Sequence, residues 1–417
     1  MLDTATEKAL REGNVEALRA LTIKAEEMRE YLKATAQYGL PNQLTVSFLL
    51  KHPAFEGFVL SSERFSDLGY FLQTNGSLFN SKERPNATNP DYSDCSAEQG
   101  AAYLKAILDK AIAIGQERDK ADEVAKRINK GFGSHERGAI DYSGVLGSGS
   151  IEAFNAYLEY TTPEHHPEYL LAASKLLHMD ADKIGILFEK VTDEETRNKA
   201  LNNAAGEVSA SNFICLFDKI TSAEARNAAL KELLRTGTDR QDPKEEWAIE
   251  KFTHATQSFV PSEEALLFIA RCAVNQGKLS MLRVLLPIMQ QNYPLLISTD
   301  GGEKQSTLLI RACKFKKEDV AEQMAFMLCK YGAKIEPDSM MQHPLSILQQ
   351  RGLETRPVAQ MMQEQLNRQM IAGRVIALRD SIASLVSPDD LPRVLAALLI
   401  NGPEQRQTKI LPSGPGG

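Results

Sequence analysis

The stretch of sequence that decides the fold is LFEKVTDEETRNKAL at residues 187–201, which recurs as LFDKITSAEARNAAL at residues 216–230. A weaker copy, YLEYTTPEHHPEYLL, covers residues 157–171. The copies repeat at a period of about 29 or 30 residues, which is typical of arrays of helical units. Each copy is predicted to hold the end of one helix and the start of the next. Because one helical hairpin cannot bury its apolar face alone, successive hairpins are expected to stack.

The turn within each copy predicts where the second helix begins. The expected capping boxes are Thr192 with Glu195 and Thr221 with Glu224. In the weak copy Thr162 is followed three residues later by His165, so the box is lost. Pro163 nevertheless suits the first position of a helix.

The composition predicts an all-α chain. Together with the repeats, it predicts a solenoid of helical hairpins with degenerate ankyrin-like repeats. Hydrophobic residues make up 43% of the chain and charged residues 25%, which excludes a largely disordered protein. Leu and Ala supply most of the apolar content, and runs of Val, Ile and Thr at strand spacing are scarce. A chain of 417 residues is longer than a usual domain, so we expect several units or one extended array.

Segments near both ends of the chain resemble ankyrin repeats. They are ALREGNVEALRAL at 9–21, IARCAVNQGKLSMLRVLL at 269–286, TLLIRAC at 307–313 with LCKYGAKI at 328–335, and HPLSIL at 343–348. The family places a glycine in the left-handed conformation between two short helices, as Gly13 and Gly277 are expected to do. The repeats are degenerate, because Leu308 stands where the family has proline and Lys316 or Lys317 where it has the turn glycine.

The resemblance implies a scaffold or adaptor that binds another protein through its loop tips and inner groove. The implied partner-binding residues are Asp300, Lys304, Gln305, Lys334, Asp338 and Gln342. Degenerate ankyrin units joined to other helical modules are similar to bacterial effectors, which implies delivery into the cytosol of a host cell.

The repeats and the loop-like stretches between them predict five parts of the chain. The predicted parts are an N-terminal helical domain at 1–130 with one ankyrin-like helix pair, helical-hairpin repeats at 151–260, ankyrin-like repeats at 261–350, C-terminal amphipathic helices at 351–400 and a disordered tail at 401–417. One helix is expected over about 97–129, and the glycine-rich stretch that follows it predicts a domain boundary.

Charge and cysteine usage predict a cytoplasmic protein. The net charge is −7 with no block of basic residues, which argues against nucleic-acid binding. The five cysteines are dispersed without a C-x-x-C pair, as in reduced proteins. No segment is apolar and long enough to cross a membrane, and the first residues do not resemble a signal peptide.

No catalytic, cofactor-binding or metal-binding residue is assigned from the sequence. The glycines at 131–138 lack the Lys-Ser/Thr of a phosphate-binding loop and are interpreted as a linker. His165 and His166 are adjacent, point in different directions on a helix, and are expected to face solvent. Cys272, Cys313 and Cys329 lie in apolar helical contexts and are expected to be buried and unreactive.

Two alternatives to the scaffold remain open. The first is a host-modifying enzyme with its site around 79–84 and 135–142, because long loops are often functional. The second is a lipid-binding domain that uses the arginine-containing C-terminal helices. The methionines between Met324 and Met370 either fill the core between imperfect repeats or line a groove for a partner helix.

Overall fold

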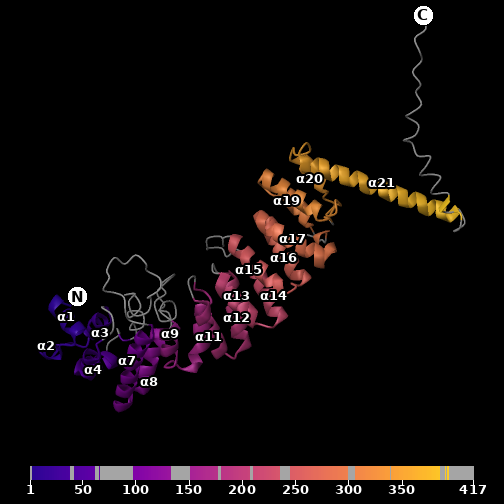
Figure 1. The fold of residues 1–417 in the computed structure, drawn as a ribbon. Coiled ribbons are helices and arrows are strands. Elements are labelled where there is room, and N and C mark those ends of the chain that lie inside the picture. The colour runs from indigo at the N-terminus through magenta and orange to yellow at the C-terminus, as the bar shows by residue number, and fades with distance from the viewer. Residues whose placement is uncertain are drawn as a thin grey trace, which may run out of the picture. The chain divides into compact units, whose positions relative to one another are not determined.

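The computed structural model describes residues 2–37, 42–61, 65, 97–132, 151–176, 180–206, 210–234, 245–298, 306–338, 340–385, 390 and 392–393. These ranges contain helices and no strand, which confirms the predicted all-α class (Figure 1). The chain forms two compact units, Met1–Cys272 (unit 1) and Ala273–Gly417 (unit 2). Within the described ranges, no helix combines the length and the apolar character that crossing a membrane requires.

Unit 1 begins with short helices and one longer helical pair. They are α1 (Thr4–Glu12), α2 (Val15–Arg19), α3 (Met28–Gln37), α4 (Gln43–Lys51), α5 (Pro53–Ser61), α7 (Ala97–Glu117) and α8 (Ala121–Phe132). The prediction of one helix over about 97–129 was wrong, because α7 and α8 are separate and pack on each other. Asp119 turns the chain with a φ of 55°. A Cβ on Gly115 would lie 3.0 Å from Val124, so the glycine allows α8 to approach α7 closely.

The repeat region follows in the same unit. Its helices are α9 (Ile151–Leu158), the 3-10 helix η3 (Pro163–His165), α10 (His166–Ala173), α11 (Ala181–Lys190), α12 (Glu194–Gly206), α13 (Ala210–Lys219), α14 (Ala223–Glu232) and α15 (Glu245–Ser258), followed by α16 (Glu263–Gln276), which continues into unit 2. Helices α10, α12 and α14 contact one another in order, and so do α11, α13 and α15. The repeated leucines at 187, 201, 216 and 230 are fully buried between them.

The helices of the two strong copies begin one residue later than predicted. Asp193 accepts a hydrogen bond from the Thr196 amide at 2.9 Å, and Ser222 accepts one from the Ala225 amide at 3.2 Å. Thr192 and Thr221 are therefore not the capping residues. The helices start at Glu194 and Ala223, and only the residue directly before the first turn can reach its free amides.

The weak copy behaves differently at the same place. Thr162 makes no capping bond with its side chain, which instead accepts a hydrogen bond from Asn129 at 3.0 Å. Pro163 occupies the first position of η3, as predicted. His166 is buried and lies 3.1 Å from the Thr161 hydroxyl, so the expectation that both histidines face solvent was wrong. Burial lowers the pKa of His166.

Unit 2 continues with helices that alternate in the same manner. They are α17 (Leu279–Asn292), the 3-10 helix η4 (Pro294–Ser298), α18 (Leu308–Cys313), α19 (Glu318–Lys330), α20 (Pro344–Gln350) and α21 (Pro357–Leu385). Helices α17, α19 and α21 contact in order, as do α18 and α20. Leu309, Ile310, Cys313, Met324 and Leu328 form a core from which water is excluded.

Candidate functional site

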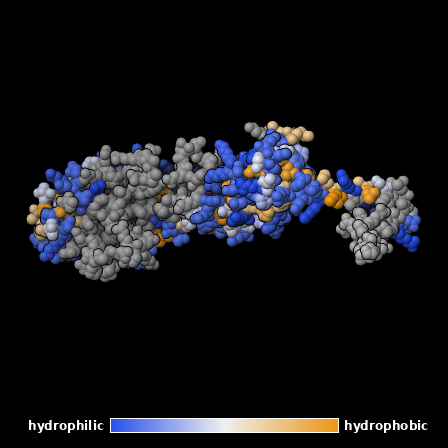
Figure 2. Space-filling view, turned by 90° about the horizontal axis from the view of Figure 1, so that it is seen from above, coloured by the Kyte–Doolittle hydropathy of each residue, from blue (hydrophilic) through white to orange (hydrophobic). Residues whose placement is uncertain are grey.

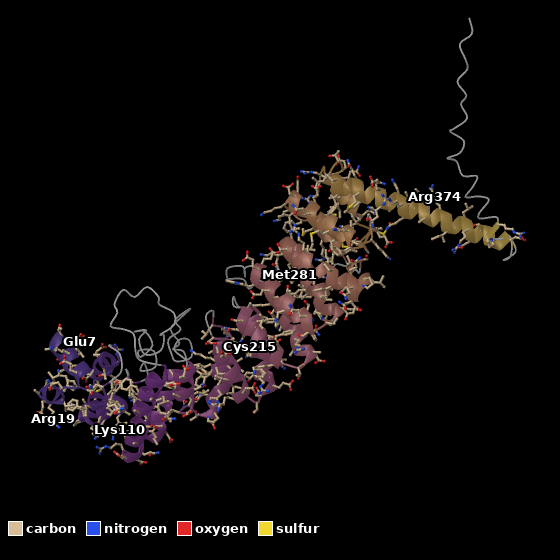
Figure 3. The ribbon with its side chains drawn as sticks, in the orientation of Figure 1. Glu7, Arg19, Lys110, Cys215, Met281 and Arg374 are labelled. Carbon is tan, nitrogen blue, oxygen red and sulfur yellow. The ribbon has the colours of Figure 1, made fainter. Side chains whose placement is uncertain are left out.

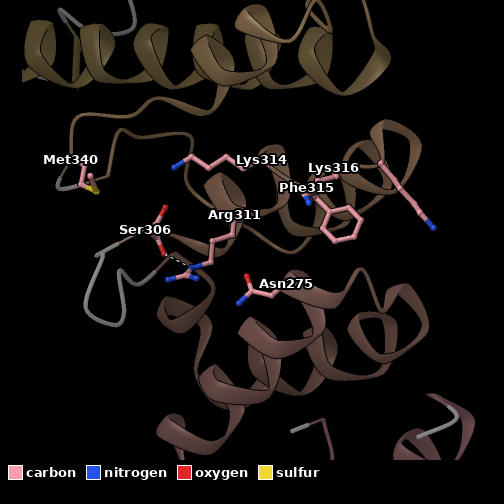
Figure 4. Close-up of a pocket in the computed structure, with 8 residues that line it drawn as sticks. Asn275, Ser306, Arg311, Lys314, Phe315, Lys316 and Met340 are labelled. Atoms are coloured by element: carbon pink, nitrogen blue, oxygen red, sulfur yellow. Dashed lines mark hydrogen bonds between the residues drawn. The ribbon is translucent and has the colours of Figure 1, made fainter. Parts of the chain in front are cut away.

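A cavity of about 700 Å³ in unit 2 is lined by mostly basic and apolar side chains (Figure 4). Its lining residues, which we call the basic pocket, are Asn275, Ser306, Arg311, Lys314, Phe315, Lys316, Lys317 and Met340. They come from the end of α16, from α18 with the turn that follows it, and from the loop before α20. The residues are therefore brought together by packing rather than by adjacency in the chain.

The wall formed by Phe315 depends on the turn between α16 and α17. Gly277 has a φ of 70°, and a Cβ placed on it would lie 2.5 Å from the Phe315 ring. Only glycine allows the ring to lie against this turn. The left-handed conformation expected for Gly277 and for Gly13 is confirmed, since both have a φ of 70°.

The turn after α18 has no glycine and is held by a distant arginine. Arg351, which follows α20, donates hydrogen bonds from its guanidinium group to the carbonyl oxygens of Cys313 and Lys316. A side chain thus satisfies the carbonyls at the end of α18 that a left-handed glycine would otherwise help to satisfy. This contact holds the turn that carries the lining residues Lys314, Phe315, Lys316 and Lys317.

The opposite edge of the basic pocket is organised by Asp338. This carboxylate is 3% exposed and accepts hydrogen bonds from the amides of Met340 at 3.0 Å and Gln342 at 2.9 Å. It also accepts one from the Ser306 hydroxyl at 3.2 Å. Ser306 in turn accepts a bond through its carbonyl oxygen from Arg311 Nε at 3.2 Å. These bonds fix the loop that carries Met340.

The charged side chains that line the pocket all have the same sign. Four of its lining residues are cationic and none is a carboxylate. The acidic residues of the first turns of α19 are engaged elsewhere, because Arg356 lies within 3.6–3.7 Å of Glu318, Asp319 and Glu322. A pocket with cations on apolar walls favours an anionic ligand that also has an apolar part.

The predicted partner-binding residues have different positions relative to this pocket. Lys334 is exposed, and its amide donates to Ser298 Oγ at 3.0 Å. Gln342 accepts a hydrogen bond from Lys314, whereas Asp338 is buried within its loop. Asp300, Lys304 and Gln305 lie outside the described residues.

Sequence reasoning missed the four cationic lining residues. The four residues KFKK at 314–317 contain Lys314, Lys316 and Lys317. In the sequence these lysines were interpreted only as residues that replace the glycine of an ankyrin turn. Arg311 precedes them by one helical turn. This spacing could have indicated a cluster of positive charge. It could not have indicated that Phe315 and Met340 line the same cavity.

A second cavity, of about 760 Å³, lies in unit 1 between the turn after α1 and the helices α4 and α5. Its charged lining residues are Glu16, Arg19 and Lys51, so it has no single sign. Arg19 is already paired with Glu16 at 2.9 Å, and its position in α2 is visible in Figure 3. Because its charged residues have both signs, this cavity discriminates less than the basic pocket between ligands of different charge.

Chemically reactive groupings are not found in the described ranges. No set of three or more His, Cys, Asp or Glu side chains there is arranged to hold a metal ion. Burial raises the pKa of both Cys313 and Cys329 to about 12, which keeps them as thiols, while Cys272 is only half-buried. Cys95 and the predicted enzyme site around 79–84 and 135–142 lie outside the described residues.

Comparisons of the chain with models of known protein families, with characterised proteins and with solved structures found no match.

Proposed function

We propose that this protein is a scaffold of stacked helical hairpins that binds an acidic segment of another protein in the basic pocket. Its parts would be degenerate ankyrin-like units near both ends of the chain and hairpin repeats in the middle of the sequence. Following the effector resemblance, we place its work in a cytosol, that of a host cell if it is delivered. The proposal rests on a repeated stacking device and on the charge of the pocket.

The stacking device is an arginine that lies over a phenylalanine of the preceding helix. Arg197 lies 4.3 Å from the centre of the Phe188 ring and donates to the Phe188 carbonyl at 3.0 Å. Arg226 repeats both contacts with Phe217, at 4.8 Å and 3.2 Å. Two sequence copies that make the same contacts support repeated units. The alternating helix contacts of both chain units agree with a hairpin array.

The proposed ligand rests on one observation, that the charged side chains lining the basic pocket are all cationic. Lys316 and Lys317 are exposed, Arg311 is half-buried, and Phe315 and Met340 offer apolar surface. An acidic peptide segment with an apolar side chain matches both features. Methionine and aromatic side chains adapt to such segments, and clustered cations accelerate their approach.

The test is charge reversal of the rim. The Lys316→Glu/Lys317→Glu variant should lose most of its affinity for a fluorescein-labelled peptide of alternating Glu and Leu, measured by fluorescence anisotropy. We expect a loss of at least about tenfold, since like charges then face the peptide. Binding by the wild-type chain should weaken as salt is raised.

The matched control is Lys330→Glu, a reversal on an exposed lysine of α19 that does not line the pocket. Its affinity should stay close to that of the wild type. Equal loss in both variants would show only a general charge effect, and full binding by the double variant would remove the pocket from the function. Circular dichroism should show that both variants remain helical.

A further inference from the structure

The four cationic side chains of the basic pocket have no carboxylate partner. Within the described residues none of them forms an ion pair, and the hydrogen bonds of Arg311 and Lys314 go to neutral groups. Glu318 and Asp319 directly follow the last of these cations in the sequence, but each lies 3.7 Å from Arg356 instead. The positive charge of the pocket is therefore available to a ligand.

Three donor groups line the pocket from the ends of α16 and α18. Arg311 is held by one hydrogen bond, which its Nε donates to the Ser306 carbonyl oxygen at 3.2 Å. Its two terminal nitrogens bond to no described residue, and neither does the exposed side chain of Asn275. Figure 4 shows the Arg311 guanidinium group beside the Asn275 amide in that view, with the Lys314 amine extending above them. Because the guanidinium group is already oriented, it loses little entropy when it binds an anion.

A phosphate ester suits these donors better than a carboxylate does. A phosphorylated side chain has a charge of about −1.5 to −2 at neutral pH and three strong acceptor oxygens. A carboxylate has a single charge and only two oxygens. One phosphate can therefore accept hydrogen bonds from all three donor groups, in the charge-assisted geometry that arginine favours.

Apolar surface lies beside the donors. Met340, which lines the pocket, is 57% exposed, and the next residue, Met341, is 81% exposed. Met341 has a φ of 56°, a left-handed conformation that residues other than glycine rarely adopt. The buried Asp338 carboxylate holds this loop through the amides of Met340 and Gln342. The described surface in Figure 2 is mostly hydrophilic with small hydrophobic patches. The exposed methionines therefore offer an apolar side chain of a ligand a place to pack.

We propose that the basic pocket binds a phosphoserine in the acidic segment of its partner. The phosphate accepts hydrogen bonds from Arg311, Asn275 and Lys314. An apolar side chain next to the phosphoserine packs on Phe315 and Met340. The inference rests on the proposed function, because it uses the same pocket and the same partner segment. Phosphorylation of the partner then controls its binding.

A phosphorylated lipid headgroup suits the pocket less well. The exposed residues Glu318 and Asp319 directly follow Lys317, so a membrane surface that reached the pocket would also meet these carboxylates. An anionic membrane surface attracts cations and repels such acidic residues. A peptide that enters the pocket avoids this repulsion.

The experiment compares three forms of one fluorescein-labelled peptide by fluorescence anisotropy with the full-length chain. They are the peptide of alternating Glu and Leu, and the same peptide with its central Glu replaced by phosphoserine or by serine. The phosphoserine form should bind about tenfold more tightly than the Glu form, and the serine form should bind most weakly. Equal affinity of the phosphoserine and Glu forms would overturn this inference and leave the proposed function standing. Failure of all three forms to bind would overturn both.

Two variants test where the phosphate binds. Arg311→Lys keeps the charge but lacks the planar fork, and Asn275→Ala removes one donor at an exposed position. Each should reduce the ratio of phosphoserine to Glu affinity by at least about threefold. The matched control is Arg283→Lys, at an exposed position of α17 that does not line the pocket, and it should keep the wild-type ratio. Circular dichroism should show that all three variants remain helical.

Two further results would overturn the inference. The first is a ratio that neither Arg311→Lys nor Asn275→Ala changes. The second comes from competition against the labelled phosphoserine peptide. Inorganic phosphate, or phosphatidylcholine vesicles that contain a phosphoinositide, would displace the peptide as effectively as the unlabelled phosphopeptide does. The ligand would then be the bare anion or a membrane rather than a peptide.

Discussion

At the scale of single residues, buried donors connect successive repeat units. Lys251 of α15 is 1% exposed, and its amine donates to the carbonyls of Ala204 at 2.9 Å and Ala205 at 3.1 Å. These carbonyls belong to the last turn of α12, where the helix has its negative end. Asn212 of α13 donates to the Leu176 carbonyl at 2.9 Å, beyond the end of α10. Polar side chains thus satisfy helix ends that the next unit buries.

The Lys251→Met variant should be less stable than the wild type. Two buried carbonyls lose their donor, so the free energy of unfolding should fall by about 1–3 kcal/mol in urea titrations. Lys231→Met is the comparison, because its ion pair with Glu264 at 2.7 Å is at the surface and should contribute below about 1 kcal/mol. A Lys251 variant as stable as the Lys231 variant would contradict this account of the contact.

Lys183 predicts a pH-dependent stability. Its amine is buried, and desolvation lowers the pKa to about 8 in the folded chain, below the ordinary 10.5. Between these values the unfolded chain binds more protons, so the contribution of this group to stability rises as pH increases from about 8 to 10.5. Below pH 8 its desolvation cost is fully present.

The Lys183→Met variant removes that titration. We expect the difference in unfolding free energy between variant and wild type, measured at pH 7 and pH 9.5, to shrink by about 1–2 kcal/mol as pH rises. Because tyrosines and cysteines of both chains titrate alike, the difference isolates Lys183. A difference that does not change with pH would show that the amine is not desolvated.

At the scale of secondary-structure elements, one capping position recurs in the repeat region. Asp193, Ser222 and Ser262 each accept a hydrogen bond from the amide three residues later. A histidine-proline cap occurs twice as well, since His52 and His343 accept from the amides of Ala54 and Leu345. The helix starts are therefore set by short local motifs.

The Ser222→Ala and Thr221→Ala variants separate the observed cap from the predicted one. Removing Ser222 should lower the unfolding free energy by about 1 kcal/mol, because the Ala225 amide loses its acceptor. Thr221→Ala should cost less, since no capping bond is lost. Thermal unfolding followed by circular dichroism compares them, and a larger loss for Thr221→Ala would return the cap to the predicted residue.

At the scale of the whole molecule, the helix contacts within each unit are between near neighbours in the chain. In the array proposed above, a local loss of stability would be transmitted mainly to adjacent helical hairpins. The basic pocket is itself assembled from α16, α18 and the loop before α20. The proposed array therefore predicts which helices lose stability when one core residue is truncated.

Leu230→Ala tests that spread in unit 1. Leu230 is fully buried, and its truncation should cost about 2–5 kcal/mol locally. Hydrogen exchange followed by mass spectrometry should show faster exchange in α12, α13 and α14, with little change in α1 to α5. Uniform acceleration across the unit would indicate a single cooperative domain and count against the array.

The sequence by itself determined the features that depend on neighbouring residues. The spacing of leucines predicted helices, Pro163 marked a helix start, and Gly13 and Gly277 were recognised as left-handed turns, because backbone conformation follows local side-chain chemistry. Even local reasoning misplaced two caps by one residue, since adjacent polar residues compete for the same amides.

Only the tertiary structure decided which distant residues meet. It buried His166, separated α7 from α8 and placed Arg351 under the turn after α18. It also gathered Asn275, KFKK at 314–317 and Met340 around one cavity. The physical reason is that periodicity specifies which face of a helix is buried, but not which neighbour buries it. That choice depends on the shape and charge of side chains that are far apart in the chain.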